Sequence, residues 1–541
     1  MGVGTTEARE APSTSPDQAR EHLFGHLTWW ARAALAVAGG LALWLAFPDH
    51  NLPTAPIGVA LSALALWGAR PLAGAGLGFL TGLGCFVPVL NWTGIYVGAF
   101  PWLALAVVQA LYVAAMGALI CWAQRPWIRA GRVLLAAAVI PAGWVLQELV
   151  RGSWPYGGFP WARLAFSQAD SGLARYAFLG GAPLVTAAVA ALGALLLILP
   201  IGTLRRGLAI LAVGAAVIVT ARLIPLPSDG PDVRIAMVQG NVPRAGLDFN
   251  AERRKVLDNH VVGSELVGEK GEDVDLVVWP ENSSDIDPLR NPDAAEQVQR
   301  ALRAVPAPLL IGAVLDEPLP EVSNASLLYR EPGDTTPERY IKQHPVPFAE
   351  YVPHRDFYRM FSQKVDLVRA GFAKGDHPVS YRLGSPNGEW AAIPTICFEV
   401  AYDGLMRDST RAAGDLPSVL IVQTNNATFG YTAESTQQFA ISRIRAIEHG
   451  RSVAHVSTVG VSGLIGPDGT HTPLTGLFTA EQVVGTVQAR APLSPSDRLG
   501  PWVEIVATLG LLALVARRSW RRRPVSWAVK TPAGRASAPT N

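Results

Sequence analysis

"AFPWLALAVVQALYVAAMGALICWAQ", residues 99–124, is a long apolar segment without a charged side chain. A run of about 20 apolar residues is long enough to cross the hydrocarbon core of a bilayer as an α-helix. We therefore predict a membrane-spanning helix here. The alternative is a buried helix of a large soluble protein. This alternative is unconvincing because the chain has several such runs in close succession, and none of them presents a polar face to water.

Similar apolar runs lie on both sides of this segment. We predict eight membrane-spanning helices, at about residues 28–47, 53–70, 72–91, 99–124, 132–150, 178–199, 206–224 and 501–517. The chain then divides into a polar cytoplasmic tail (1–26), seven transmembrane helices (27–225), a domain of ordinary globular composition (226–500), an eighth helix (501–517) and a basic cytoplasmic tail (518–541). The first tail has no cleavage signature, so we expect the first helix to be retained as an anchor.

The arginines between the apolar runs predict the orientation, because short cytoplasmic loops carry the positive excess of a membrane protein. These arginines are Arg70, Arg125, Arg129, Arg132, Arg205, Arg206 and, after the last run, Arg517, Arg518, Arg521, Arg522 and Arg523. Eight crossings place all of them on one side. Residues 226–500 are then expected on the opposite, extracytoplasmic face.

Composition excludes several functional classes. Half of the 541 residues are hydrophobic and only 16% are charged, against about a quarter charged in a typical globular chain. The net charge of +2 offers a nucleic-acid partner no electrostatic support. Three cysteines cannot all pair, and two of them, Cys85 and Cys121, lie in apolar runs. A disulfide framework is therefore not expected.

Residues 226–500 have the pattern of an α/β domain. Short β-rich runs such as "VRIAMVQG", "PLLIGAV" and "SVLIVQT" alternate with helical stretches near residues 250–266, 293–304 and 432–449. The pattern predicts a sheet with helices on its faces, and the segment is long enough to bury a full core.

Three short stretches in this domain carry chemistry. "VVWPEN" places Glu281 just after an apolar strand, "YIKQHPVPFAEYVP" carries Lys342 and Glu350, and "TICFEV" places Cys397 at the end of another strand. A cysteine attacks as the thiolate and needs a base or a cation nearby. Glu281 could take the thiol proton if burial raises its pKa, and Lys342 could stabilise the thiolate and a developing oxyanion. The backbone N–H of Phe398 could be a second oxyanion donor.

The order of these motifs resembles the carbon–nitrogen hydrolase (nitrilase) superfamily, whose triad is Glu, Lys and Cys. Placed between the seventh and eighth of eight predicted helices, they resemble the apolipoprotein N-acyltransferase family in particular. Further stretches agree with that family: "GGFPWARLAFSQ" at 157–168, "MVQGNVP" at 237–243, "TNNATFG" at 424–430 and "RIRAIEHGRSVAHVSTVGVSG" from Arg443. The resemblance implies an α-β-β-α sandwich for the extracytoplasmic domain.

The resemblance also implies an activity. In that family, the counterpart of Cys397 takes an acyl chain from a membrane phospholipid, typically the sn-1 chain of phosphatidylethanolamine, as a thioester. The amine of the diacylglyceryl-cysteine of a lipoprotein then receives it. Glu281, Lys342 and Cys397 are the expected catalytic residues, and Glu350, Phe398 and Glu399 the supporting ones. The resemblance further implies no cofactor or metal, no nucleic-acid partner, a monomer, and the bacterial inner membrane with the catalytic domain on its periplasmic face.

Other positions could have either a functional or a purely structural role. Residues 350–372 carry many aromatic and apolar side chains, which suggests a lid dipping into the membrane interface or, equally, a loop packed within the domain. On a continuing strand, Glu399 would face the same side as Cys397. His344 is expected to be structural, and Asn425 and Asn426 could line the pocket or form a turn.

The chain departs from the family pattern at several places. Phe398 stands where tyrosine is common, Ala349 where glycine is common and Thr428 where tryptophan is common, and Phe249 is the nearest aromatic to an expected tryptophan. These departures bear on acyl-chain and donor preference. Two alternative functions remain: a membrane-tethered amidase in which water resolves the thioester, and a non-catalytic membrane scaffold, against which the intact triad speaks.

Overall fold

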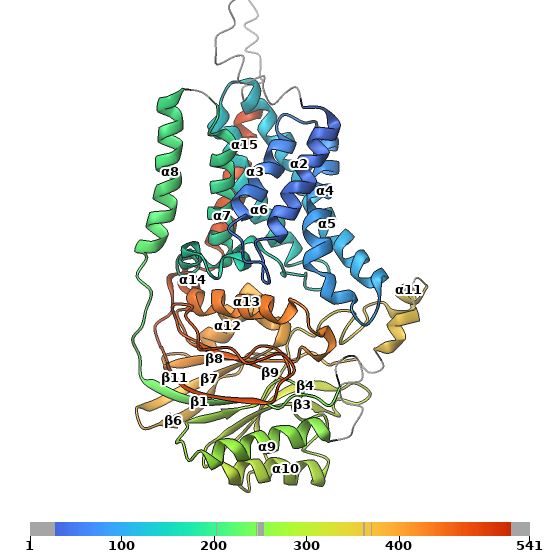
Figure 1. Ribbon diagram of the computed structural model, residues 1–541, viewed down its shortest axis with the longest axis vertical. Coiled ribbons are helices and arrows are strands. Elements are labelled where there is room, and N and C mark those ends of the chain that lie inside the picture. Colours follow the sequence, from blue (N-terminus) through green and yellow to red (C-terminus); the bar gives the residue numbers. More distant parts are fainter. Residues whose placement is uncertain are drawn as a thin grey trace, which may run out of the picture.

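The computed structural model describes residues 27–201, 203–244, 246, 254–360, 363–368 and 371–520. These residues form a bundle of long helices and, next to it, a domain with two sheets (Figure 1). The bundle helices are α2 (Trp29–Trp44), α3 (Ala55–Leu66), α4 (Pro71–Val89), α5 (Ala99–Arg129), α6 (Val133–Arg151), α7 (Ala177–Ile198), α8 (Leu204–Leu223) and α15 (Trp502–Trp520). Each lies at a predicted apolar run.

Five helical segments of the described chain are long and apolar enough to cross a membrane: Pro71–Val89, Ala99–Arg129, Val133–Arg151, Gly172–Ile198 and Leu204–Leu223. Of the other three, two are shorter than the sequence predicted. Helix α2 ends at Trp44, and α3 spans only Ala55–Leu66, since Gly68 adopts a left-handed conformation just beyond it. Helix α15 runs on to Trp520, past its predicted end at residue 517.

Small residues allow the bundle helices to approach closely. Three glycines at four-residue spacing on α4, Gly74, Gly78 and Gly82, face α5. A Cβ atom at Gly78 would lie 2.3 Å from the carbonyl oxygen of Val113. Membrane helices associate through such small-residue faces because lipid supplies no hydrophobic drive between them. Helix α8 differs from the rest, since it stands apart from the bundle and is largely exposed (Figure 1).

The second part of the molecule contains two sheets. The first has the strand order β11-β1-β2-β3-β4-β5, with β1 (Asp232–Gln239), β2 (Leu276–Val278), β3 (Leu309–Leu315), β4 (Ser323–Tyr329), β5 (Glu338–Ile341) and β11 (Glu481–Gln488). The second has the order β10-β9-β8-β7-β6, with β6 (Tyr381–Ser385), β7 (Gly388–Ile396), β8 (Ser418–Thr424), β9 (Val453–Ser457) and β10 (Gly463–Ile465). The strands β1, β2 and β3 are parallel, as are β7, β8 and β9.

The alternation of side chains along β1 explains the layering. Val233, Ile235 and Met237 pack into the core between the two sheets, whereas Ala236 and Val238 pack against helices on the other face. Successive side chains of a strand point to opposite faces, and both faces are apolar here because both are covered. The sequence therefore specifies a strand buried on both sides.

Helices form the two outer layers of this sandwich. Helices α9 (Lys255–Glu269) and α10 (Pro292–Ala304) cover the first sheet on the side away from the bundle (Figure 1). Helices α12 (Asp403–Ala412) and α13 (Glu434–His449) cover the second sheet, and their core is continuous with that of the bundle. The result is the expected α-β-β-α sandwich. Helix α12 was not predicted, and residues 250–253 of the predicted 250–266 helix lie outside the described chain.

Candidate active site

Cys397 lies where the second sheet turns toward the bundle. Strand β7 ends at Ile396, and Cys397 begins the 3₁₀ helix η5 (Cys397–Ala401) with a φ of 56°. A left-handed backbone is uncommon for a residue other than glycine and is often found at functional sites. The side chain is only partly buried. The turn thus lifts the thiol out of the strand pattern and leaves it accessible.

Glu281 follows strand β2 and is almost fully buried, with 3% of its surface exposed. One carboxylate oxygen accepts hydrogen bonds from Asn324 Nδ2 (2.6 Å) and Lys342 Nζ (3.1 Å). The other accepts one from the backbone N–H of Asn425 (2.9 Å). Every contact comes from a different segment, so the carboxylate joins both sheets at their edge.

Lys342 comes directly after the edge strand β5 and is 1% exposed. Besides Glu281, its ammonium group contacts Glu350 Oε1 at 2.8 Å. The second oxygen of Glu350 accepts a hydrogen bond from the N–H of Val346 at 2.6 Å, which closes the loop between the two residues. The structure therefore brings Glu281, Lys342 and Glu350 into direct contact.

Burial and charge act together on the titration of this cluster. Burial raises the pKa of Glu281, the neighbouring Lys342 opposes the shift, and the Glu350 carboxylate adds to it. Burial alone would lower the pKa of Lys342, but the Glu281 and Glu350 carboxylates raise it well above its ordinary value. The pair accordingly holds a firmly protonated cation beside a carboxylate that is suited to accept a proton.

Glu281 and Lys342 also affect the pKa of the Cys397 thiol. Burial and the Glu281 carboxylate raise the pKa of Cys397, whereas the Lys342 ammonium lowers it. Two side chains lie close to Sγ, with the Thr424 hydroxyl oxygen at 3.6 Å and the Gln438 amide nitrogen at 3.7 Å. At rest the thiol thus keeps its proton, and the groups around it are those that could remove the proton and stabilise the resulting anion.

The position of Glu399 differs from the prediction that it would share a strand face with Cys397. The strand ends at Ile396, so Glu399 belongs to the 3₁₀ turn and does not share a strand face with Cys397. Its carboxylate accepts hydrogen bonds from the N–H groups of Gln343 (2.6 Å), His344 (3.1 Å) and Ile396 (2.7 Å) and from the Tyr340 hydroxyl (2.8 Å). It therefore ties the segment that carries Lys342 to the turn that carries Cys397.

Phe398 connects this turn to the helix bundle. Its ring stacks on Trp161 (centroids 5.2 Å apart, planes 10° apart) and on Phe159 (5.3 Å, 29°), both from the loop that follows α6. The Trp161 indole in turn donates to Gln437 of α13 at 2.7 Å. The position where a tyrosine is common is thus held by ring packing between the two parts of the molecule.

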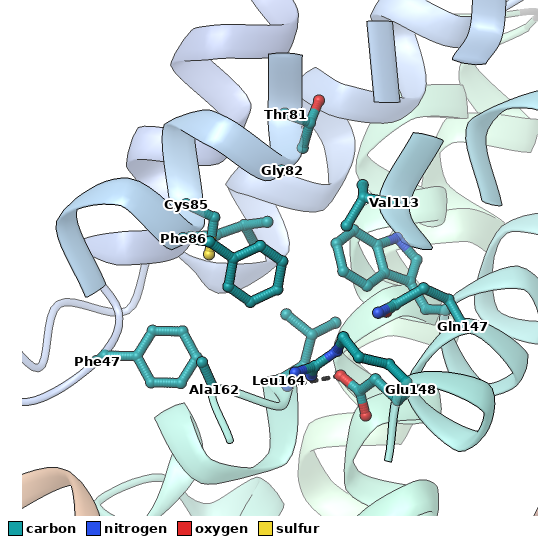
Figure 2. A pocket seen from close by; sticks show the side chains of 13 residues that line it. Phe47, Thr81, Gly82, Cys85, Phe86, Val113, Gln147, Glu148, Ala162 and Leu164 are labelled. Atoms are coloured by element: carbon teal, nitrogen blue, oxygen red, sulfur yellow. Dashed lines mark hydrogen bonds between the residues drawn. The ribbon is translucent and has the colours of Figure 1, made fainter. Parts of the chain in front are cut away.

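A buried set of charges makes the same connection. Arg163, in the loop after α6, contacts Glu148 of α6 and Asp403 of α12. Arg445 of α13 contacts Asp403 and Glu448. Figure 2 shows the bundle end of this set: Glu148 borders a small cavity and accepts a hydrogen bond from the N–H of Leu164. The thirteen residues that line the cavity do not include Glu281, Lys342 or Cys397.

The predicted lid, residues 350–372, is described only in part, and Phe361 lies outside the described chain. We call this segment the arm. It contains helix α11 (Arg355–Arg359), which projects beside the end of the bundle (Figure 1). The Tyr358 hydroxyl lies 3.2 Å from that of Tyr156, in the loop after α6. Phe357 and Met360 are 52% and 72% exposed. The arm thus rests on the bundle and still presents apolar surface.

Several residues of the site were not predicted from the sequence. Asn324 donates to both Glu281 and Glu350, but nothing in "VSNASLLY" marks it, because its role depends on the pairing of β4 with β5. Gln438 and Glu434 lie on α13 in a stretch of ordinary helical pattern. His344, expected to be structural, stacks on Tyr402 at 4.6 Å. In the described part of the chain, no three His, Cys, Asp or Glu side chains are grouped as metal ligands would be.

Known proteins resemble the chain over almost its whole length. Residues 39–195 match the family described as apolipoprotein N-acyltransferase N-terminal domain, and residues 234–492 match carbon-nitrogen hydrolase. The apolipoprotein N-acyltransferase of Mycolicibacterium smegmatis is 37% identical over 91% of this chain and 86% of its own length. That of Azotobacter vinelandii is 31% identical over 92% of this chain and 97% of its own length.

Among solved structures, an amidase from Nesterenkonia sp. aligns with 49% of this chain and 94% of its own, at 17% identity and a TM-score of 0.34. The assignment itself follows from the full-length relatives and the two matched families. This chain belongs to the apolipoprotein N-acyltransferase family, with the carbon–nitrogen hydrolase domain of that family between its seventh and eighth apolar helices.

Proposed function

We propose that this protein transfers an acyl chain from a membrane phospholipid to the N-terminal amine of diacylated lipoproteins, through a thioester on Cys397. The observation that carries the proposal is the contact of Lys342 with Glu281 (3.1 Å) in the same buried cluster that acts on the Cys397 thiol. We assign Glu281 as the base, Lys342 as the cation and Cys397 as the nucleophile, and the membership of the chain in the family named for this activity supports the assignment.

In the first half of the reaction, Cys397 Sγ attacks the ester carbonyl of the phospholipid. Glu281 takes the thiol proton as the S–C bond forms. Lys342 Nζ and the N–H of Phe398 hydrogen-bond the oxyanion. The C–O ester bond then breaks, and Glu281 returns the proton to the glycerol oxygen of the leaving lysophospholipid. An acyl thioester on Cys397 remains.

In the second half, the amine of the lipoprotein's diacylglyceryl-cysteine attacks the thioester carbonyl. Glu281 accepts a proton from the amine as the N–C bond forms, and the C–S bond breaks with sulfur leaving as the thiolate. The thiolate recovers the proton from Glu281. A phosphatidylethanolamine-like donor is our expectation for the first half, and one chain supplies all three catalytic residues, so we expect a monomer to be active.

The placement of the site supports these substrates. The core of α12, α13 and η5 is continuous with that of the helix bundle, so Cys397 lies on the side of the sandwich that faces the bundle. Burying an acyl chain is worth about 0.8 kcal/mol per CH₂, so neither substrate leaves the bilayer readily. We propose eight crossings of the bacterial inner membrane, with residues 226–500 on the periplasmic face and the arm near Tyr156 covering the mouth of the site.

Orientation has its own test. A protease site inserted at Asn387, in the exposed turn between β6 and β7, is expected to be cut from outside intact spheroplasts. Cleavage only in inverted membrane vesicles would contradict the periplasmic placement.

A transfer assay tests the activity. The full-length protein in vesicles receives a phospholipid with a labelled acyl chain and a synthetic diacylated lipopeptide, with Cys397→Ala as the control. We expect label on the amine of the lipopeptide in the first protein only. Label released solely as free fatty acid would indicate a hydrolase, and no Cys397-dependent product would indicate a scaffold.

A further inference from the structure

A second set of polar side chains lies near the Cys397 sulfur, and none of its members comes from strand β5. It consists of Thr424 at the end of β8, Asn426 just beyond it, and Glu434 and Gln438 on α13. We call these four residues the sulfur-side network. Thr424 and Gln438 are fully buried, and Asn426 and Glu434 are 2% exposed. The mechanism derived above uses none of them.

The hydrogen bonds of this network have a defined direction. The hydroxyl oxygen of Ser457 accepts from the N–H groups of Gly460 (2.7 Å) and Val459 (3.3 Å), which leaves its own proton to be donated to Asn426 Oδ1. The Asn426 amide is thereby oriented, with Nδ2 turned the other way. It donates one proton to Glu434 Oε2 (2.6 Å) and the other to Gln438 Oε1 (3.0 Å).

The direction of Asn426 fixes that of Gln438. Oε1 of Gln438 faces two donors, Asn426 Nδ2 and the Thr424 hydroxyl at 2.7 Å. A flipped amide would set two N–H groups against each other, so Nε2 must point the opposite way, toward Cys397 Sγ at 3.7 Å. Since the single Thr424 proton goes to Gln438, the Gln438 amide is the donor that remains for the sulfur.

We propose that Gln438 is a further catalytic residue, whose amide stabilises the Cys397 sulfur as an anion, and that Asn426 and Glu434 are positioning residues that hold this amide. In terms of the proposed transfer, on which this role rests, the sulfur bears negative charge when it attacks the ester and again when it leaves the thioester. A neutral donor favours both steps, and it weakens the thiolate as a nucleophile less than a second cation that lowered the pKa of the thiol further.

The environment of Glu434 agrees with a role as an acceptor. Burial raises the pKa of Glu434 to about 8, against the Asn426 hydrogen bond, and the Glu281 carboxylate adds to the rise. Near neutral pH the group is then mostly uncharged, while its Oε2 still accepts from Asn426. Glutamine has the same shape and the same acceptor, so it should replace Glu434 well. Leucine offers no acceptor and should not.

The test measures the reactivity of Cys397 without any lipid substrate. The full-length protein is alkylated with iodoacetamide across a pH series, and modification of the Cys397 peptide is followed by mass spectrometry, which separates it from Cys85 and Cys121. The titratable groups acting on this thiol are Glu281, Lys342 and Glu434, and all are kept in Gln438→Met. We expect this variant to react about tenfold more slowly below the midpoint, with the midpoint at higher pH.

Three further variants separate positioning from general damage. Glu434→Gln should react like the unaltered protein, whereas Glu434→Leu should slow alkylation severalfold. Gln299→Met on the outer helix α10 should change nothing. An unaltered pH profile in Gln438→Met overturns the proposal. If that variant does not fold, equal rates in Glu434→Gln and Glu434→Leu overturn it.

Acyl transfer to the lipopeptide is measured in parallel. If Gln438→Met is alkylated like the unaltered protein while the unaltered protein transfers the acyl chain, the role of Gln438 is contradicted and the proposed function is not. A retained alkylation effect in a protein that transfers no acyl chain contradicts the proposed function and supports the role of Gln438 toward sulfur.

Discussion

The two helix layers of the sandwich differ in what they cover. The outer pair, α9 and α10, packs apolar side chains on the first sheet and forms exposed ion pairs such as Arg300–Glu265. The inner pair, α12 and α13, lies between the second sheet and the bundle, and several polar side chains of α13, such as Gln438, Arg445 and Glu448, are buried with fixed partners. We infer from this comparison that buried polar side chains of the inner layer surround the proposed nucleophile and connect the domain to the helix bundle, while those of the outer layer face solvent.

The largest effect is expected inside the site. Lys342→Met removes the cation that contacts Glu281 and Glu350 and acts on the Cys397 thiol. Loss of a transition-state donor in a dry site typically lowers the rate by about 10²–10³-fold. Initial rates of acyl transfer measure this loss, and a variant that retained more than a third of the activity would remove Lys342 from the mechanism.

The link between the inner layer and the helix bundle predicts the largest effect on stability. Asp403→Asn leaves Arg163 and Arg445 without the carboxylate they share, and breaking such a buried pair typically costs about 3–5 kcal/mol. The melting temperature in detergent should fall clearly. The matched outer variant, Glu265→Gln, breaks an exposed pair with Arg300 and should leave the melting temperature unchanged. Similar shifts for both variants would erase the contrast between the layers.

A smaller effect is expected from the arm. Phe357→Ser combined with Tyr358→Ser removes apolar surface and the contact with Tyr156. If the arm engages the interface, transfer from vesicle-embedded phospholipid should fall about tenfold, with less change for substrates dissolved in detergent. Equal activity on vesicles would support the alternative, a loop that only packs within the domain.

The smallest predicted change is a shift along the pH axis. The Glu350 carboxylate raises the pKa of Glu281, and transfer requires Glu281 to be deprotonated so that it can accept a proton. Glu350→Gln removes that negative charge, so the pKa of Glu281 should fall. The acidic limb of the pH–rate profile should therefore move to lower pH, whatever the height of the plateau. A shift to higher pH would contradict the assignment of Glu281 as the base.

Much of this architecture could be predicted from the sequence, for identifiable reasons. The long apolar runs of the sequence correctly predicted where every bundle helix lies. The side chains of β1 point alternately to its two faces, and they are apolar on both because both faces are buried. Glu281 and Cys397 were singled out because each follows a predicted strand, whereas Lys342 was singled out as the cation that a thiolate needs nearby, and the structure places it directly after β5. The partners of Glu399 could not be predicted, because they depend on a 3₁₀ turn that the strand pattern hides. The role of Gln438 could not be predicted either, because it depends on the orientation of its amide, which is fixed by contacts with Thr424 and Asn426 in the folded protein.

The most direct test of the account is to trap the intermediate. Purified protein is incubated with a phospholipid of known acyl chain and no acceptor, and the intact Cys397 peptide is weighed by mass spectrometry. We expect the peptide to gain the mass of one acyl chain, to lose it on addition of a diacylated lipopeptide, and to gain nothing in Glu281→Gln. Transfer of the acyl chain to the lipopeptide by a Cys397→Ala protein, without any acylated cysteine, would contradict the account.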